Sequence, residues 1–465
     1  MTRYRIAREV FSLPSEQGHL VYAPLLQTSV VVNDAALNLL SDIAAERAVP
    51  HDVRTREVLD LLEELELIGK ANGRRRAGGA TPAPSGAVAS CEHRGHDLGA
   101  AVKPTAVTLF LTTACNLRCV YCYASGGERP RYLAPEVAFD AIDLVVANAV
   151  ERGETEVRVT FHGGGEPTLA AESLRRCVDH ARRRCEQHSV EFRTGTATNG
   201  VMSDDIREYL AETMTSVMVS IDGPPEVQNH LRPRADGGPS SAAVERTLER
   251  LSQSEVTLGV RLTCTADALD HAAETVRHLV SAYRLKTIHL EPLFVCGRSL
   301  GSDLRAPSAA RFVEVFRAGR RIADRHGVEL AYSGARQSSL ACSFCQVSSP
   351  SFNVTTEGDV TACYEVTGRD DPRAETFVYG SHDPARRSFV FDQARVAALR
   401  RLTVHDAPRC ARCFAKYHCA GDCPSKRLYA GADDAVIARC EINRRLTLDQ
   451  LEEVIRCQTT SAAAI

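Results

Sequence analysis

The sequence predicts an α/β fold built on a parallel sheet, with a small unit before it and a cysteine-rich segment after it. Three observations support this: strands alternate with helices from residue 104 to about residue 300, polar motifs follow several of those strands, and cysteines cluster late in the chain. Six strands are fewer than the eight of a closed barrel. The expected strands are 107–111, 157–161, 193–198, 216–221, 257–263 and 287–291, with helices such as 135–151 and 171–187 between them.

The composition is that of an ordinary globular chain. Its 465 residues suffice for two or three domains, and the formal net charge of −3 gives no sign of broad attraction to nucleic acid or membranes. The first residues lack an apolar signal region, and no stretch approaches the roughly 20 apolar residues that span a bilayer. We therefore expect a cytoplasmic protein. In that reducing compartment, clusters among the 17 cysteines favour metal binding over disulfides.

Residues 1–72 predict a small winged-helix-like unit, because two short strands are followed by two helices. A generic dimerisation or capping domain is the alternative. A DNA-reading role is less favoured because the stretch 59–64 would present an acidic helix to phosphates. The expected strands are 20–24 and 29–32, and the expected helices run from the Asn33 cap past Asp42 and from Thr55 to Ile68.

Three connecting segments complete the predicted organisation. Residues 73–103 are rich in glycine, proline and arginine and predict a flexible linker. Residues 301–340 predict a bridging segment with one amphipathic helix. Residues 446–465 predict a C-terminal helix and tail, after a cysteine-rich domain at 341–445.

Cys115, Cys119 and Cys122 stand in a Cys-x3-Cys-x2-Cys pattern directly after the first strand of the sheet. Soft thiolates on a short loop select iron–sulfur clusters, copper(I) or zinc. Three thiols are one too few for a closed tetrahedral site, whereas a four-iron cluster held by three cysteines keeps one iron open for chemistry. The spacing therefore indicates a reactive metal site.

Other polar motifs follow later strands, where the loops of parallel α/β folds carry their sites. Three glycines precede Glu166, so that the backbone can approach a ligand closely and the carboxylate can accept bonds from an ammonium group. A Gly-rich structural turn is the alternative interpretation. The residues that we expect in the loops at the carboxyl ends of these strands are Gly164, Gly165, Glu166, Asn199, Ser220, Asp222, Arg232 and Leu293.

Eight further cysteines gather in the last third of the chain. Their number suits two fully ligated four-iron clusters, but paired Cys-x2-Cys units suit zinc knuckles as well. They are Cys342, Cys345, Cys363, Cys410, Cys413, Cys419, Cys423 and Cys440.

The cysteine loop, with Tyr121 before its last thiol, and the Gly-Gly-Glu motif resemble the radical SAM (S-adenosylmethionine) superfamily. The late cysteine block, with Gly358 ahead of Cys363, resembles the SPASM extension of that superfamily. The resemblance implies a partial (β/α)6 TIM barrel, SAM bound to the open iron of one [4Fe–4S] cluster, and two auxiliary [4Fe–4S] clusters. It assigns Cys342, Cys345, Cys363 and Cys423 to the first auxiliary cluster, and Cys410, Cys413, Cys419 and Cys440 to the second.

The same resemblance assigns contacts to SAM. It implies that Glu166 holds the amino group, that Ser220 contacts the ribose and that Arg232 pairs with the carboxylate. Leu293 would line the adenine pocket. Tyr121, Gly164, Gly165, Asn199 and Asp222 complete the expected cofactor contacts.

Two positions depart from the sulfatase-maturing branch of the family. Gly163 stands where that branch often has glutamine, and His162 is a possible substitute, although a histidine that ends a strand is more often structural. Tyr364 and then Glu365 follow Cys363, where that branch has an aspartate proposed as the base. The second departure argues against simple dehydrogenation of a serine or cysteine. An exposed loop position is the commoner case for Glu365.

The expected function is modification of a ribosomally made precursor peptide, because residues 1–72 are similar to the peptide-recognition element of peptide-modifying gene clusters. A 5′-deoxyadenosyl radical would abstract hydrogen and lead to an intramolecular thioether or carbon–carbon crosslink. Expected partners are a leader-bearing peptide and an electron donor such as flavodoxin or ferredoxin, but neither nucleic acid nor a membrane. The alternatives are a protein residue, as in sulfatase maturation, a small molecule, or a zinc-binding winged-helix regulator.

Overall fold

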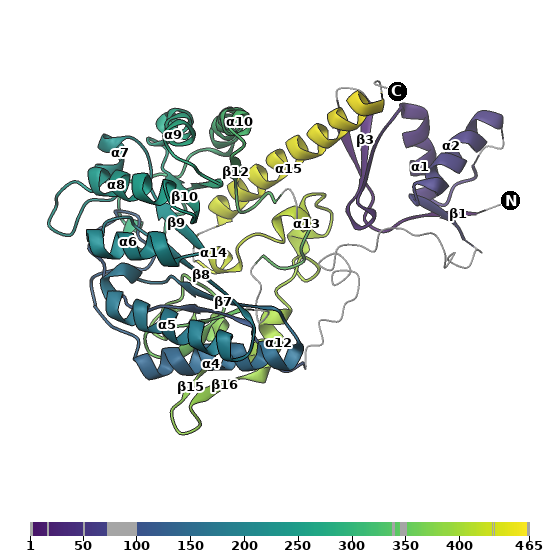
Figure 1. Cartoon of the computed structure of the whole chain (residues 1–465). Helices are drawn as coiled ribbons and strands as arrows, with labels where there is room; N and C mark the ends of the chain where they lie inside the picture. Colours follow the sequence, from purple (N-terminus) through teal and green to yellow (C-terminus); the bar gives the residue numbers. More distant parts are fainter. Residues whose placement is uncertain are drawn as a thin grey trace.

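The computed structural model describes residues 3–15, 18–49, 52–71, 100–336, 340–344, 351–429, 431 and 433–462. An N-terminal unit lies at one side of a larger α/β body, and the long helix α15 (Asp433–Ala462) extends from the body to that unit (Figure 1). Most of the predicted linker 73–103 and Cys345 fall outside the described residues.

The N-terminal unit contains the two strands and two helices expected from the sequence, and three more strands. Asn33 caps the first helix by accepting a hydrogen bond from the Ala36 amide, as expected. The second helix ends at Glu64 rather than Ile68, because Ile68 pairs with Ile6 in a short antiparallel sheet. The elements are β1 (Tyr4–Ile6), β2 (Phe11–Ser15), β3 (Gly18–Ala23), β4 (Thr28–Val32), α1 (Asp34–Ala44), α2 (Val53–Glu64) and β5 (Ile68–Lys70), and β2, β3 and β4 form one antiparallel sheet in that order.

The body is organised around an eleven-stranded sheet in which the six expected strands are neighbours in chain order and run parallel. The prediction of an α/β fold with a large, mostly parallel sheet is therefore confirmed. The six strands are β6 (Ala106–Leu109), β7 (Glu156–Phe161), β8 (Glu191–Thr198), β9 (Ser216–Ser220), β10 (Thr257–Cys264) and β11 (Thr287–Pro292).

Helices form an outer layer around these strands (Figure 1). Alternate strand residues, such as Leu258, Val260 and Leu262, are buried in the core that the helices share, because strand side chains point to opposite faces in turn. We call the opposite face of the sheet the inner face. The helices are α4 (Pro135–Arg152), α5 (Ala171–Gln187), α6 (Asp204–Thr213), α7 (Pro225–Leu231), α8 (Ser241–Ser252), α9 (Leu269–Ala282) and α10 (Ala309–Arg325).

The C-terminal part of the chain extends the same sheet instead of forming a separate core. The strand β13 (Ser351–Val354) lies parallel to β6, and β12 (Glu329–Ala331) lies parallel to β11. Phe352 and Tyr379 belong to the same buried cluster as the six parallel strands. Residues on both sides of residue 340 therefore share one buried core. The further elements are β14 (Asp359–Thr361), α11 (Ala374–Phe377), β15 (Val378–Asp383), β16 (Ser388–Phe391), α12 (Gln393–Arg400), α13 (Lys416–Cys419) and α14 (Pro424–Arg427).

The closing helix begins earlier than expected. Helix α15 starts at Asp433 and carries Cys440, so the boundary predicted at residues 445/446 falls inside one continuous helix. The charged residues around Cys440 hide the helical period that Leu451 and Ile455 show more clearly.

Helix α15 also joins the N-terminal unit to the rest of the molecule. Leu20 and Tyr22 of β3 pack with Leu451 and Ile455 of α15 in one buried cluster. One face of the N-terminal sheet is thus covered by the C-terminal helix, while its other face packs on α1 and α2. Sequence patterns did not predict this contact between the two ends of the chain.

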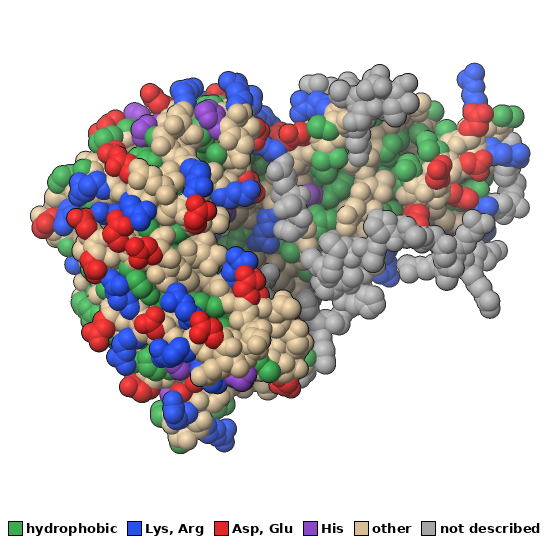
Figure 2. Space-filling model, viewed as in Figure 1, with side chains coloured by type: hydrophobic (Ala, Val, Ile, Leu, Met, Phe, Trp, Pro, Cys, Tyr) green, Lys and Arg blue, Asp and Glu red, His purple; other side chains and the backbone are tan. Residues whose placement is uncertain are grey.

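The surface carries mixed charges. Figure 2 shows acidic and basic side chains interspersed over the visible face of the body. In the described part of the chain, every helix is too short or too polar to cross a membrane.

Candidate active site

The segment Cys115–Cys122, which we call the cysteine loop, lies beyond the carboxyl end of β6. Arg118 folds back over it, and its Nη1 donates to the carbonyl oxygens of Cys115 and Leu117, both at 2.8 Å. Because neither carbonyl accepts from another backbone amide of the described residues, the guanidinium supplies the donors that a loop otherwise lacks.

Arg298, which follows β11, holds the other half of the cysteine loop. Its Nη1 donates to the Cys119 carbonyl at 2.8 Å, and its Nη2 donates to the Gly126 carbonyl at 3.1 Å. Its backbone amide donates to the Cys122 carbonyl at 2.9 Å. Sequence reasoning missed this residue, because nothing in its own neighbourhood indicates a contact with a loop about 180 residues away in the chain.

Nitrogen donors approach two of the three sulfur atoms. The Leu117 amide lies 3.5 Å and the Asn199 Nδ2 lies 3.7 Å from the Sγ of Cys115. The Gly126 amide lies 3.5 Å from the Sγ of Cys122. Such donors stabilise negative charge on sulfur, which is what metal-bound thiolates carry.

As free thiols, Cys115 and Cys119 would be protonated. Burial raises the pKa of Cys115 to about 12 and the pKa of Cys119 to about 11. A bound metal would supply the charge that removes those protons. Among the described residues, no group of three or more His, Cys, Asp or Glu side chains is arranged so that it could hold a metal ion. The donor chemistry of the loop nevertheless fits a thiolate-ligated cluster.

Glu166 is buried beside the cysteine loop at the carboxyl end of β7. Its Oε1 accepts hydrogen bonds from the hydroxyls of Thr168 and Thr198, both at 2.8 Å. Its Oε2 accepts from the Asn199 amide at 2.7 Å. Burial raises the pKa of Glu166 and these donors oppose that rise. The carboxylate is therefore fixed in place, with most of its acceptor capacity in use.

Asn199 connects this carboxylate to the cysteine loop. In addition to its contact with Cys115, its Nδ2 donates to the Asn116 Oδ1 at 2.8 Å. Its own Oδ1 accepts from the Val201 amide at 2.8 Å. The loops after β6, β7 and β8 are thus joined by one polar network, as expected for neighbouring strand ends.

The guanidinium of Arg232 forms a buried ion pair within the chain. Its Nε and Nη2 donate to the two carboxylate oxygens of Asp222, at 2.8 and 3.1 Å. The Tyr121 hydroxyl donates to the same carboxylate, and the Thr263 amide donates to it at 3.0 Å. The fork of Arg232, which the sequence assigned to the SAM carboxylate, is engaged by a buried acid of the chain itself.

The glycines before Glu166 are required by contacts between loops. A Cβ on Gly165 would lie 2.2 Å from the Ala114 carbonyl oxygen, and a Cβ on Gly126 would lie 2.6 Å from that of Gly164. Gly163 has φ +121°, and a Cβ there would meet the Phe110 ring at 2.3 Å. A glutamine therefore cannot replace Gly163 without a backbone change.

The remaining expected cofactor residues lie at neighbouring strand ends. Ser220 is the last residue of β9, and Leu293 is buried just after β11, with its amide donating to the Cys264 carbonyl at 2.8 Å. The His162 ring packs against the Tyr364 ring, with centroids 4.7 Å apart and the ring planes tilted by 41°. Burial and then Arg261 lower the pKa of His162 to about 4, so this ring is neutral at physiological pH.

The late cysteines separate into two groups. The charge of Cys363 is among the causes, after burial and Glu365, that raise the pKa of Cys423 to about 12, so these two thiols are neighbours. Cys342 is disulfide-bonded, and it packs in a small apolar cluster with Cys410, so a ligand role for it requires that bond to be reduced. The second group, linked by mutual effects on pKa, is Cys410, Cys413, Cys419 and Cys440.

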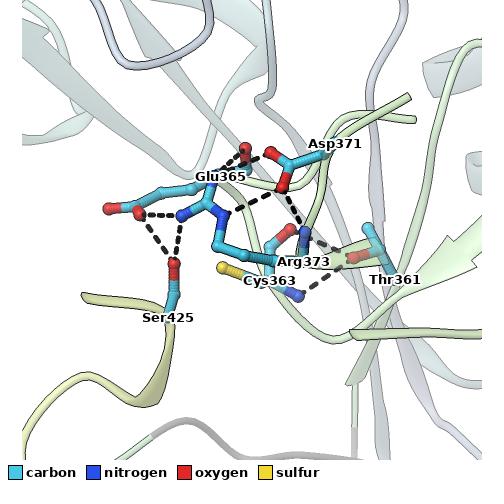
Figure 3. Close-up of polar contacts among 6 residues, drawn as sticks. All are labelled: Thr361, Cys363, Glu365, Asp371, Arg373 and Ser425. Carbon is cyan, nitrogen blue, oxygen red and sulfur yellow. Dashed lines mark hydrogen bonds and ion pairs between the residues drawn. The ribbon is translucent and has the colours of Figure 1, made fainter. Parts of the chain in front are cut away.

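Glu365 is not the exposed loop acid that the sequence indicated. Its side chain is only 18% exposed, and its Oε2 accepts from Arg373 Nη1 at 3.1 Å and from Ser425 Oγ at 2.8 Å. Arg373 also pairs with Asp371 (Figure 3). The network connects the segment after Cys363 to the helix after Cys423, so it brings two predicted ligands of one cluster together.

A second buried ion pair stands among the other late cysteines. Arg439, next to Cys440, donates from Nε and Nη2 to the two oxygens of Asp422, both at 2.9 Å. Burial alone would raise the pKa of Asp422, but Arg439 holds it at about 2. This pair joins helix α15 to the turn that carries Cys419 and Cys423. The sequence, which only placed two charged residues beside cysteines, did not reveal it.

Residues 109–277 match the family described as the Radical SAM superfamily. This segment is a radical SAM domain. Such a domain implies SAM and a [4Fe–4S] cluster, and the cysteine loop at its start is the part of this chain whose donors fit that cluster.

The chain is similar to a sulfatase-maturating enzyme and to a mycofactocin maturase. It is 25% identical over 336 residues to a serine-type anaerobic sulfatase-maturating enzyme of Klebsiella aerogenes, which covers 68% of this chain and 79% of that one. It is 35% identical over 158 residues to the mycofactocin maturase MftC of Mycolicibacterium smegmatis, covering 33% of this chain and 36% of that one. A match to an uncharacterised protein of Methanocaldococcus jannaschii is 26% identical and spans 40% of this chain and 61% of the relative.

The fold has a solved counterpart. The structure of native anSMEcpe with bound AdoMet superposes with a TM-score of 0.56 at 15% identity, covering 75% of this chain and 99% of that one. At this identity the likeness shows the fold alone.

Proposed function

We propose that this radical SAM enzyme modifies a ribosomally synthesised precursor peptide and forms an intramolecular thioether or carbon–carbon crosslink. The observation that carries the proposal is the cysteine loop, where three thiols, two of them with N–H···S donors, lie beside the buried Glu166–Asn199 network. Cys115, Cys119 and Cys122 would hold a [4Fe–4S] cluster that binds SAM. Such a cluster, once reduced, would supply the electron for the cleavage of SAM to methionine and a 5′-deoxyadenosyl radical.

The residues around the cysteine loop would position the cofactor. Arg118 and Arg298 donate hydrogen bonds to the loop carbonyls, and these bonds would hold the three thiols in position during the reaction. Glu166 has an oxygen with a single hydrogen bond from Asn199, which leaves room to accept one from an ammonium group. The neutral His162 and Tyr364 present rings instead of charges, which suits a site that must exclude water.

Two auxiliary [4Fe–4S] clusters belong to the proposal. Cys363 and Cys423, with Cys342 and Cys345, would hold the first, and the reduced state of Cys342 is a condition for it. Cys410, Cys413, Cys419 and Cys440 would hold the second. A flavodoxin- or ferredoxin-type donor in the cytoplasm would supply electrons.

The N-terminal unit supports a peptide substrate. Strand β4 is an edge of its sheet, and its valines give an extended, apolar edge that an added strand can pair with. The other edge, β2, contains Pro14, which lacks a backbone N–H. We therefore place the leader peptide along β4. A docked leader would raise the local concentration of the core peptide to about millimolar.

A single preparation tests the main claim. Anaerobically reconstituted protein should be brown, bind about twelve irons at four per cluster, and release 5′-deoxyadenosine from SAM under reduction. A leader-bearing precursor should lose mass by two hydrogens, and a core peptide without its leader should react much more slowly. A colourless zinc protein that leaves SAM intact would support the alternative of a zinc-binding regulator instead.

A second candidate keeps the chemistry but changes the substrate. The match to the sulfatase-maturating enzyme of Klebsiella aerogenes spans 79% of that relative, which favours a protein residue as the target. Against it stand Tyr364 and the ion-paired Glu365 where that branch has its proposed base. Incubation with a sulfatase-derived peptide separates the two candidates, because only the second predicts an aldehyde product.

A further inference from the structure

Arg261 stands in the middle of strand β10 on the inner face of the sheet. Its neighbours in sequence, Val260 and Leu262, are buried against the helices, so the alternation of the strand turns Arg261 away from them. In register beside it are Ser220 on β9 and His289 on β11. Arg261 remains exposed although strands flank it on both sides.

Groups from several elements surround this guanidinium. After burial, its charge lowers the pKa of His162 on the loop after β7, and it also acts on Tyr123 next to the cysteine loop. It is one of three cations, with Arg439 and Lys426, that lower the pKa of the buried Glu291. Arg261 therefore faces the region between the cysteine loop, β7 and β11.

Within the described part of the chain, no carboxylate is bound to Arg261. Its guanidinium makes no hydrogen bond and no ion pair with any residue that the structure describes. The carboxylate of Glu291 instead accepts from the amide and the hydroxyl of Ser333, both at 2.9 Å. By contrast, Arg232 and Arg439 each hold a buried carboxylate with two nitrogens.

His289 supplies a second unmatched polar group in the same row of the sheet. Its Nδ1 is buried and has no hydrogen-bond partner among the described residues. Burial lowers the pKa of His289, so the ring is neutral and can donate one hydrogen bond. A buried unpaired nitrogen is costly unless a ligand satisfies it.

We propose that Arg261 and His289 form a carboxylate-binding site on the inner face of the sheet. The proposal rests on the function proposed above. Two molecules in that reaction carry the required group: SAM, through its methionine part, and the peptide, through an acidic side chain or its C-terminus. The bidentate Asp222 contact of Arg232 leaves the SAM carboxylate in need of another guanidinium, and Ser220, next to Arg261, is an expected SAM contact.

Equilibrium dialysis on the anaerobic holoenzyme tests the site with defined probes. The probes are SAM, decarboxylated SAM, acetyl-glutamate amide and acetyl-glutamine amide. Loss of a hydrogen-bonded charge pair should weaken the binding of the relevant carboxylate about ten- to a hundredfold in Arg261→Gln. Arg261→Lys keeps the charge and should recover part of that loss. Arg277→Gln, on the outer helix α9, is the matched control and should bind every probe as the wild type does.

The outcomes identify the source of the carboxylate. If Arg261→Gln binds SAM more weakly but decarboxylated SAM equally well, the site holds the cofactor. If SAM binding is unchanged and the preference for acetyl-glutamate amide over acetyl-glutamine amide disappears, it holds the substrate. If neither preference changes in Arg261→Gln or in Arg261→Lys, the proposal is wrong. Failure of the wild type to crosslink a peptide would contradict the proposed function, while these binding results would stand.

Discussion

The cysteine loop and the late cysteine segment keep their thiols in place by different means. In the loop, three thiols within eight residues follow one strand, and Arg118 and Arg298 hold the backbone carbonyls between them. In the late segment the thiols are spread from residue 342 to residue 440, and buried ion pairs such as Asp422–Arg439 join the pieces.

Among the described residues, the N-terminal unit contacts the late cysteine segment. The Tyr22 hydroxyl lies 2.7 Å from the Nε2 of His418, and Glu9 pairs with Lys416 at 2.6 Å. Both partners lie between Cys413 and Cys419. Closely spaced ligands are therefore held in place by one supported loop, whereas widely spaced ligands need buried contacts from distant parts of the chain to bring them together. Point variants are thus sharper tests of leader binding than deletion of residues 1–72.

The largest effect is expected from removing a thiol of the cysteine loop. Cys115→Ala should lower the bound iron by about four per chain and abolish release of 5′-deoxyadenosine, because the cluster loses one of its three ligands. Iron analysis and chromatography of the products measure both. Cys177→Ala, a buried cysteine on α5, is the control and should keep its iron and its activity. Equal loss of iron in both variants would contradict the assignment.

Breaking the buried pair should chiefly affect stability. Asp422→Asn leaves Arg439 buried without a counter-charge, which should lower the free energy of unfolding by about 3–5 kcal/mol. Urea unfolding followed by circular dichroism measures the change. The exposed pair Arg445–Glu441 on the same helix gives the control, since Glu441→Gln should cost no more than about 1 kcal/mol. Similar losses in the two variants would show that burial does not distinguish the two pairs.

Arg298→Gln tests how the cysteine loop is held in place. The loss of charged hydrogen bonds to two carbonyls should cost about 1.5–3 kcal/mol locally. Because Arg298 also places positive charge near Cys119, the midpoint potential of the loop cluster should fall, while the potentials of the late clusters should not. Redox titration followed by electron paramagnetic resonance reports both, and an unchanged loop potential would argue that Arg298 has no influence there.

The smallest effect is expected at the contact between the two ends of the chain. Tyr22→Phe leaves the Nε2 of the buried His418 without its partner, at a cost of about 1–3 kcal/mol. The late clusters should then be lost faster to an iron chelator, while the loop cluster should exchange at the wild-type rate. Tyr4→Phe, elsewhere in the same unit, serves as the control. Uniform loss from all clusters in Tyr22→Phe would show that the contact does not act on the late segment.

Alternating apolar residues made the six parallel strands and their helices predictable, because strand and helix periods are local properties of the sequence. The Asn33 cap and the grouping of Cys410 with Cys413 are of the same kind. The pairing of β13 with β6 was not predictable, because the sequence of a short apolar strand does not specify which strand it pairs with. The buried state of Glu365 depended on Arg373 and Ser425, which the sequence does not place beside it.

The residues that can carry the chemistry were evident from the sequence alone: three closely spaced thiols, a glycine-supported carboxylate and two sets of late cysteines. Ligand spacing and strand period are local patterns that span only a few residues, so the sequence is enough to recognise them. Which charged side chains form ion pairs with each other was evident only from the tertiary structure. The guanidinium of Arg232 is paired with Asp222, whereas the guanidinium of Arg261 is not paired with any described residue. Such pairing depends on distances between segments that meet only when the sheet forms.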